Sequence, residues 1–143
     1  QTYMRVVIDT NVLISAFLSR QGTSARILVL FETGIFEVVV SQPILDEYQA
    51  ALGYERVRQR HGMTDEEIKQ RIADLRTAAL FVTPTVSVAV VSDPDDNMLF
   101  AAAIAGQADV VVSGDTAVQA VKEYQGIRVL PPALFLALLE QKI

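Results

Sequence analysis

An apolar run near the start of the chain, ended by an acidic residue, most strongly limits the possible folds. Val6, Val7 and Ile8 form the run, Asp9 follows it, and a second apolar stretch covers residues 12–18. Consecutive β-branched residues are typical of a strand buried on both faces, as in parallel sheets covered by helices. We therefore expect Asp9 at the carboxyl end of a strand, with a helix after it. In open α/β sheets, ligands bind at that edge.

The alternation of strand and helix continues along the chain. Apolar runs predict further strands at residues 36–40, 81–82, 109–112 and 127–130. In the first half of the chain, helices are expected over residues 12–18, from a cap at Thr23 or Ser24 to Gly34, and from residues 41–43 onward. The capping box of Thr64 and Glu67 predicts the start of a fourth helix. Further helices are expected over residues 98–105, from Asp115 to about Tyr124, and from Pro131 onward. Residues 52–62 are the least regular part. This order predicts a single α/β domain over residues 4–143 with a mostly parallel sheet.

Composition excludes several function classes. The 143 residues contain no cysteine, which rules out disulfides and thiolate zinc sites. His61 is the only histidine in the sequence, which disfavours a Ser-His-Asp triad. The net charge of −5 argues against a broad basic surface for nucleic acid. No stretch is long and apolar enough for a membrane span, and the residues before Met4 do not resemble a signal peptide. We expect a soluble, cytoplasmic protein.

Four acidic residues are predicted at the same edge of the sheet. Asp9 ends the first strand, and Asp115 lies three residues beyond the strand that ends at Val112. Glu47 lies about one turn into the helix after residue 40 and borders its apolar stripe, whereas Asp46 points further away. Asp96 lies at the start of the apolar helix. If the strands are parallel, all four acids converge.

A carboxylate cluster of this kind indicates metal chemistry. Two like charges about 4 Å apart repel by about 4 kcal/mol at an effective dielectric near 20, so the carboxyl groups must share protons or hold a cation. Oxygen ligands without His or Cys favour Mg²⁺ or Mn²⁺. Such ions activate water and bind a phosphodiester, which is nuclease chemistry.

Four motifs in this order resemble a PIN domain. They are Asp9-Thr10-Asn11-Val12, Glu47 in Leu45-Asp46-Glu47, Asp93-Pro94-Asp95-Asp96-Asn97, and Ser113-Gly114-Asp115. The similarity extends from Met4 to the end and is greatest to PIN proteins described as toxins of toxin–antitoxin pairs. It implies a Rossmann-like, mostly parallel sheet of about five strands between two helical layers. It also implies an Mg²⁺- or Mn²⁺-dependent endoribonuclease acting on RNA, commonly a homodimer, silenced by a small antitoxin protein.

The resemblance also assigns residues. Asp9, Glu47, Asp96 and Asp115 match the acidic quartet of the family, as metal ligands and catalytic residues. Asn11 and Ser113 occupy positions where the family often has polar residues lining the pocket, and Asp93 is the second choice after Asp96. Arg56, Arg58 and Arg60, with His61, could guide RNA phosphates toward the pocket or form an ordinary solvated face.

Other interpretations stay open at this point. Each aspartate could simply cap a helix or form an Asx-turn. Haloacid-dehalogenase-like phosphatases also have an aspartate after their first strand, but this chain has Asn11 where those phosphatases have a second aspartate. A response-regulator receiver fits less well. An RNA-processing nuclease without an antitoxin, or a module that binds metal or RNA without turnover, is also compatible with the sequence.

Overall fold

The computed structural model describes residues 3–143; Gln1 and Thr2, which precede the predicted domain, lie outside the described residues. The strands are β1 (Arg5–Ile8), β2 (Glu37–Val40), β3 (Leu80–Phe81), β4 (Val110–Val112), β5 (Glu123–Tyr124) and β6 (Ile127–Leu130). The helices are α1 (Thr10–Leu18), α2 (Thr23–Glu32), α3 (Gln42–Leu52), α4 (Glu55–His61), α5 (Asp65–Ala78), α6 (Pro94–Ala105), α7 (Thr116–Gln119) and α8 (Pro132–Glu140).

The strands form one sheet with the order β3-β2-β1-β4-β6-β5 among residues 3–143. All neighbouring pairs are parallel except β5 with β6. The carboxyl ends of β1, β2 and β4 therefore lie at one edge, where Asp9, Ser41 and Ser113 follow them. The sequence prediction of an α/β fold with a mostly parallel sheet is confirmed.

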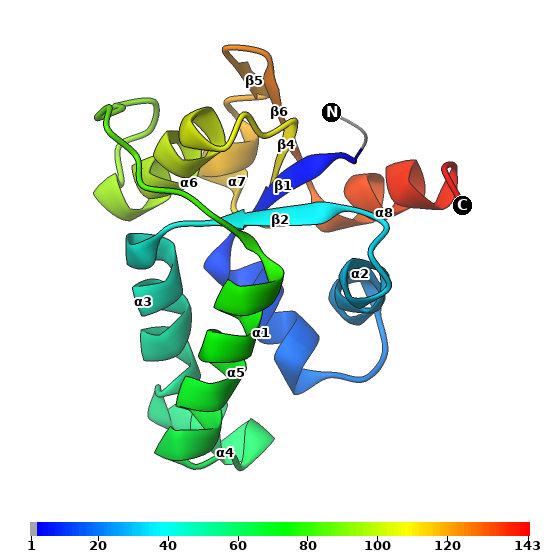
Figure 1. The fold of residues 1–143 in the computed structure, drawn as a ribbon, viewed down its shortest axis with the longest axis vertical. Helices are drawn as coiled ribbons and strands as arrows, with labels where there is room; N and C mark the ends of the chain where they lie inside the picture. Colours follow the sequence, from blue (N-terminus) through cyan, green and yellow to red (C-terminus); the bar gives the residue numbers. More distant parts are fainter. Residues whose placement is uncertain (1–2) are drawn as a thin grey trace.

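Helices cover both faces of the sheet (Figure 1). α6 packs on β1, β2 and β4, whereas α1, α2, α3, α5 and α8 pack on one another on the opposite face. Val6, Val7 and Val111 are fully shielded from solvent, which shows that the central strands are buried on both faces. The three-layer arrangement therefore follows from the apolar runs.

Four details of the predicted elements were wrong. Residues 55–61, expected to be irregular, form the helix α4, whose Glu, Arg and Gln residues are good helix formers. The helix after Asp115 ends at Gln119 instead of continuing to about Tyr124. A sixth strand, β5, follows and pairs with β6 through a two-residue turn at Gln125 and Gly126. α2 also starts earlier than expected, because Gly22 is its N-cap and Thr23 is its first helical residue.

None of the helices within residues 3–143 is long and apolar enough to cross a membrane.

Candidate active site

Strand register places Asp9 beside Ser113 at the sheet edge. Ile8 pairs with Val112, and the Asp9 amide continues this ladder by donating to the Val112 carbonyl at 2.9 Å. Asp9 follows Ile8 and Ser113 follows Val112, so these two residues lie side by side beyond the paired positions. The Ser113 hydroxyl donates to Asp9 Oδ2 at 2.5 Å, while Asp9 Oδ1 accepts from the Thr10 amide at 2.7 Å. Both carboxylate oxygens are thus oriented in a side chain only 8% exposed.

Ser113 also connects Asp9 to Asp115. The fully buried Ser113 hydroxyl accepts from the Asp115 amide at 3.0 Å. Asp115 is exposed and caps α7 by accepting from the Ala117 amide at 2.7 Å. Asp9 and Asp115 therefore do act as helix caps, as the simpler interpretation expects. Capping uses one oxygen of each carboxylate, and ionised carboxylates have about four acceptor sites.

Glu47 is directed by the packing of α3. Its neighbour Tyr48 is fully buried and donates its hydroxyl to the carbonyl of Ile8, the residue before Asp9. This contact fixes α3 against the end of β1. Glu47 is half-buried, whereas Asp46 is exposed and accepts from Gln42 Nε2 at 2.8 Å. Glu47 is thus more buried than Asp46, and its role in the site stays a prediction.

The acidic run before Asn97 separates into different environments. Asp93 is the exposed N-cap of α6 and accepts from the Asp95 amide at 2.9 Å. Asp95 is also exposed, whereas Asp96 in the first turn of α6 is half-buried. Asp93, Asp96 and Asp115 line one cavity. Asp96 is thus more buried than Asp93, and the choice of Asp96 over Asp93 as the site residue stays a prediction.

The acids influence one another's ionisation. Burial raises the pKa of Asp96 to about 6, and the charges of Asp9, Asp93, Asp115 and Glu47 contribute to this shift. Burial also raises the pKa of Asp9, against the opposing effect of the Ser113 hydrogen bond. The pKa of Glu47 is raised by burial and then by Asp95. Carboxyl groups from four separate segments thus share one electrostatic environment.

The donor chemistry of this cluster fits a hard divalent cation, because its candidate ligands are carboxylate oxygens. Among residues 3–143, no three His, Cys, Asp or Glu side chains stand together in an arrangement that could hold a metal ion. Mg²⁺ usually keeps several waters and takes only one or two carboxylates from the protein. The side chains that would bind this cation are Asp9, Glu47, Asp96 and Asp115.

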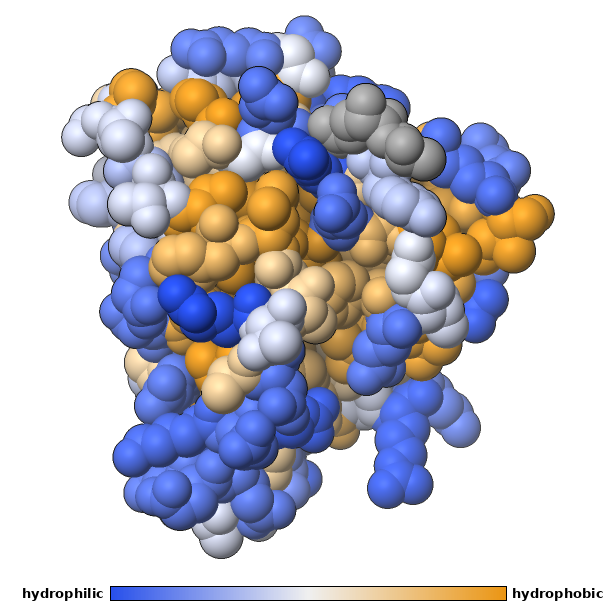
Figure 2. Space-filling view, viewed as in Figure 1, coloured by the Kyte–Doolittle hydropathy of each residue, from blue (hydrophilic) through white to orange (hydrophobic). Residues whose placement is uncertain are grey.

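The basic segment lies away from the cluster. Arg56, Arg58 and Arg60 belong to α4, at the end of α3 remote from β2, where the surface is hydrophilic (Figures 1 and 2). Because the segment is helical, Arg58 does not share the face of Arg56 and Arg60. Arg58 pairs with Asp65 at 2.5 Å instead. The suggested RNA contact of these residues stays a prediction.

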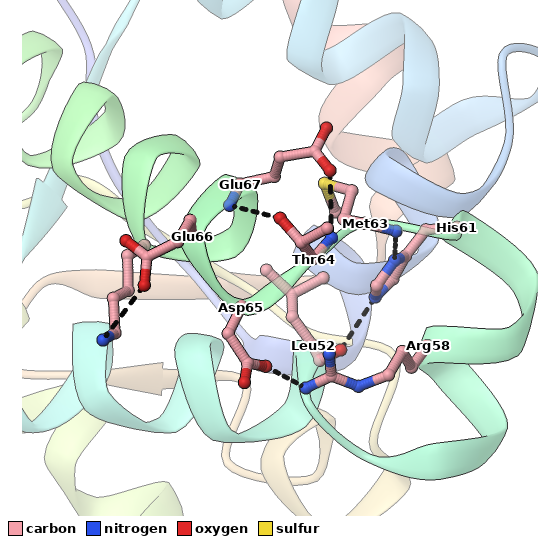
Figure 3. Close-up of polar contacts among 9 residues, drawn as sticks. Leu52, Arg58, His61, Met63, Thr64, Asp65, Glu66 and Glu67 are labelled. Atoms are coloured by element: carbon pink, nitrogen blue, oxygen red, sulfur yellow. Dashed lines mark hydrogen bonds and ion pairs between the residues drawn. The ribbon is translucent and has the colours of Figure 1, made fainter.

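His61 has a structural role at the same corner (Figure 3). Its Nδ1 accepts from the Met63 amide at 2.8 Å, which leaves Nε2 to donate to the Leu52 carbonyl at 2.8 Å. Both ring nitrogens are therefore engaged with backbone that joins α3, α4 and α5.

Two residues that support the site were missed as such in the sequence. Tyr48 was assigned only to the core stripe, and Asn97 only to a motif. The Asn97 Oδ1 accepts from the amides of Val90 and Val91 at 2.9 and 3.0 Å, and its Nδ2 donates to the Val91 carbonyl at 2.9 Å. The only sequence signal for this role of Asn97 was its position just inside a helix that follows a long loop rich in β-branched residues.

Comparison with known proteins decides the family. Residues 5–117 match the family described as PIN domain. The chain belongs to the PIN-domain family. PIN domains are generally nucleases, which favours the nuclease interpretation over the phosphatase one. A comparison with curated proteins gives no match.

A solved structure supports the PIN fold independently. The crystal structure of PAE2754 from Pyrobaculum aerophilum is similar, with a TM-score of 0.64 and 14% sequence identity. The alignment covers 96% of this chain and 90% of that chain. At this identity the similarity shows the fold alone.

Proposed function

We propose that this PIN domain is a metal-dependent endoribonuclease that hydrolyses RNA phosphodiesters with Mg²⁺ or Mn²⁺. The observation that carries the proposal is electrostatic: at the carboxyl edge of the sheet, the charges of Asp9, Glu47 and Asp115 contribute to the raised pKa of Asp96. An uncompensated cluster of this kind is costly, and a divalent cation would offset the repulsion. The bound ion supplies positive charge for the phosphodiester and an acidified water.

The protein side chains would orient this chemistry. Ser113 holds the Asp9 carboxylate by its hydroxyl and holds Asp115 by accepting from its amide. The half-buried Asp96 has a pKa raised to about 6. A cation bound beside it would favour its ionised form. Cleavage would leave a 5′-phosphate and a 3′-hydroxyl.

The proposed biological role is that of a toxin in a toxin–antitoxin pair acting in the cytoplasm. Under this proposal the chain forms a homodimer, and a small antitoxin protein covers the acidic pocket. The resemblance of the four acidic motifs to toxins of this family supports the role. RNA processing without an antitoxin is the second candidate within the same chemistry.

An RNA cleavage assay tests the enzymatic proposal. Purified protein is incubated with end-labelled single-stranded RNA in Mg²⁺, in Mn²⁺ and in excess chelator. We expect cleavage only with metal, and a loss on the order of 100-fold or more in Asp9→Asn, because several kcal/mol of transition-state stabilisation depends on the metal.

A matched pair of variants on α3 serves as control. Glu47→Gln is expected to lose activity, whereas Asp46→Asn, one residue earlier and exposed, should retain it. Chelator-resistant cleavage, or full activity in Asp9→Asn, would contradict the proposal. For the toxin role, expression of the wild type should arrest growth of a host cell and expression of Asp9→Asn should not.

A further inference from the structure

A second cavity lies at the edge of the sheet opposite to the acidic cluster. Because β1, β4 and β6 are parallel, their amino ends share one edge, and Asp9 and Ser113 follow the other edge. The cavity adjoins the start of β1 through Met4 and the start of β4 through Val110, and it encloses about 470 Å³. We call it the amino-edge pocket. Its volume lies within the roughly 300–1,000 Å³ of pockets that bind small organic molecules.

Strand register and α8 together form the walls of this pocket. Val110 pairs with Arg128 across the parallel β4–β6 ladder, so both side chains lie on the same face of the sheet. Leu138 comes from α8, and Lys142 comes from the turn after it, where the Lys142 amide donates to the Leu139 carbonyl at 3.0 Å. β1 begins and α8 ends on the same side of the molecule (Figure 1). Segments distant in the sequence thus bring two cationic side chains to one cavity.

Within residues 3–143, neither cation of the pocket has an acidic partner. Arg128 and Lys142 are both exposed, and none of the ion pairs among the described residues includes them. Glu123 lies opposite Arg128 in the β5–β6 ladder, but the two side chains form no ion pair in the part of the chain that the structure describes. The N–H groups of both cations can therefore bind an anion in the cavity.

One acidic residue also lines the pocket, and it is engaged at the start of β1. Asp109 Oδ2 accepts from the Arg5 amide at 2.9 Å. Two cations and one carboxylate give the lining side chains a formal charge of +1, although the whole chain carries −5. This local excess of positive charge favours an anionic ligand.

The remaining lining of the pocket is mostly apolar. Met4 is half-buried, Val110 is only 2% exposed, and Leu138 adds its side chain from α8. The ring of Tyr3 borders the same space and is exposed. An inorganic anion would leave this apolar surface without a contact, and a plain hydrocarbon would leave the two cations without one. The pocket therefore suits a small molecule with an anionic group on an apolar or aromatic body.

A phosphate monoester is the anion that best matches a pair of cations. The guanidinium of arginine binds two phosphate oxygens at once, and the lysine ammonium acts as a point charge beside it. A phosphate monoester carries a charge of about −1.5 to −2 at pH 7, whereas a carboxylate carries only one negative charge. Two cations therefore balance the phosphate more fully than either does alone.

We propose that the amino-edge pocket binds a small organic phosphate monoester, with its phosphate on Arg128 and Lys142 and its apolar body against Met4, Val110 and Leu138. The pocket shares no residue with the acidic cluster, so this inference does not rest on the proposed nuclease function.

Binding can be followed at a single methyl group. The chain has three methionines, and Met4 lines the pocket whereas Met63 and Met98 do not. Protein labelled at methionine methyl groups is titrated by NMR with phenyl phosphate, with chelator present so that no divalent cation takes part. We expect the Met4 resonance to shift and those of Met63 and Met98 to stay in place. No shift of Met4 at millimolar phenyl phosphate would overturn the proposal.

Three further titrations separate the phosphate from the body that carries it. Inorganic phosphate, phenol and glucose 6-phosphate should each bind about 10-fold or more weakly than phenyl phosphate, because each lacks either the charge or the apolar body. Equal affinity for inorganic phosphate would show a simple anion site. Equal affinity for phenol would show an apolar pocket without a role for the cations. Equal affinity for glucose 6-phosphate would show that the apolar wall makes no contact. Each of these three results would overturn the proposal.

Variants of the two cations test their role. Arg128→Gln and Lys142→Gln should each weaken binding of phenyl phosphate about 10-fold, the loss typical of a charge-assisted hydrogen bond. Arg20→Gln and Lys69→Gln remove the same charges from exposed positions that do not line the pocket, and should leave the affinity unchanged. An equal loss in these controls would indicate a general effect of net charge and would overturn the assignment.

A conservative variant separates charge from fold. Arg128→Lys keeps the positive charge but not the two-pronged geometry, so it should lose less affinity than Arg128→Gln. If both variants of Arg128 lose binding to the same extent, the residue acts through the structure of β6 and not through its charge, and the proposed phosphate contact is wrong.

Discussion

At the scale of single residues, the site depends on side chains that orient carboxylates. Ser113 is the clearest example, because one buried hydroxyl donates to Asp9 and accepts from the Asp115 amide. Partners that orient metal-binding side chains typically change affinity or activity by about 10- to 100-fold when removed. Ser113 is therefore a positioning residue and not a metal ligand in this arrangement.

Replacing Ser113 tests this role. Ser113→Ala should weaken Mn²⁺ binding about 10-fold or more, because the Asp9 carboxylate loses the hydrogen bond that orients it. Isothermal titration with Mn²⁺ measures the affinity directly. Ser15→Ala, an exposed serine of α1, is the control. Unchanged Mn²⁺ affinity in Ser113→Ala would show that Asp9 is oriented by other contacts.

The raised pKa of Asp96 predicts a pH-dependent stability. In metal-free protein this pKa is about 6 against an ordinary value of 3.8, so the folded chain holds the proton more tightly than the unfolded chain. The stabilising contribution is therefore complete below about pH 4 and is lost as the pH rises through 6. Asp96→Asn should raise the unfolding free energy at pH 7 by about 1 kcal/mol, after allowance for solvent screening, and have no such effect at pH 4.

Urea unfolding at both pH values, with chelator present, measures this difference. Asp46→Asn, whose side chain points away from the cluster, should show no pH-dependent gain. Equal stability of wild type and Asp96→Asn at pH 7 would indicate that Asp96 is not destabilised by its neighbours.

At the scale of elements, the segment between β3 and α6 gains its order from one side chain. Its β-branched residues favour a strand, but pairing with β2 stops shortly after Phe81 and Pro84 has no amide hydrogen to continue it. Asn97 supplies the missing partners for two backbone amides and one carbonyl. The loop is thus held by α6 and not by the sheet.

Removal of this side chain should loosen the segment. Asn97→Ala is expected to lower the free energy of unfolding by about 2 kcal/mol, because the backbone groups of Val90 and Val91 lose their partners. Hydrogen exchange at these two amides should become faster. Asn11→Ala, an exposed asparagine, is the stability control. Unchanged exchange at Val90 and Val91 would refute this assignment.

A separate prediction concerns the stability of the corner formed by α3, α4 and α5. His61→Ala should lower the free energy of unfolding by about 1–2 kcal/mol, since it removes the bonds to the Leu52 carbonyl and the Met63 amide. RNA cleavage at a temperature where the variant is folded should be unchanged. Slower cleavage in the folded variant would instead support an RNA-guiding role for this basic segment.

At the scale of the whole molecule, metal binding and stability should be coupled. The chain has a formal charge of −5, and part of the acidic charge is concentrated where four segments meet. A ligand that binds only the folded state at 100 times its Kd stabilises by about 2.7 kcal/mol. We expect saturating Mn²⁺ or Mg²⁺ to raise the Tm by roughly 5–10 °C.

Differential scanning calorimetry measures this shift. Chelator should reverse it, and Asp9→Asn should reduce it, whereas NaCl at equal ionic strength should not reproduce it. A Tm that depends on ionic strength alone would point to general charge screening and against a specific metal site.

Much of the fold was predictable because it is encoded by local patterns. The runs ending at Ile8, Val40 and Val112 are apolar on both sides, and the capping box of Thr64 and Glu67 marks the start of α5. β5 was missed because its residues, Glu123 and Tyr124, lie within the helix that was expected to run to about Tyr124. Its turn has positive φ at Gln125 and Gly126, and Gln-Gly is a weaker turn signal than Asn-Gly.

The sequence by itself determined most of the strands and helices in their order along the chain, with α4 and β5 as exceptions, and the placement of acidic residues after the strands. It could do so because strand burial and helix capping depend on neighbours in the chain. Only the tertiary structure decided which groups touch. Ser113 meets Asp9 through strand register across 104 residues, and Tyr48 fixes α3 on the Ile8 carbonyl across 40 residues. Such contacts depend on how the layers pack, and no local pattern specifies the partner of a hydrogen bond at that separation.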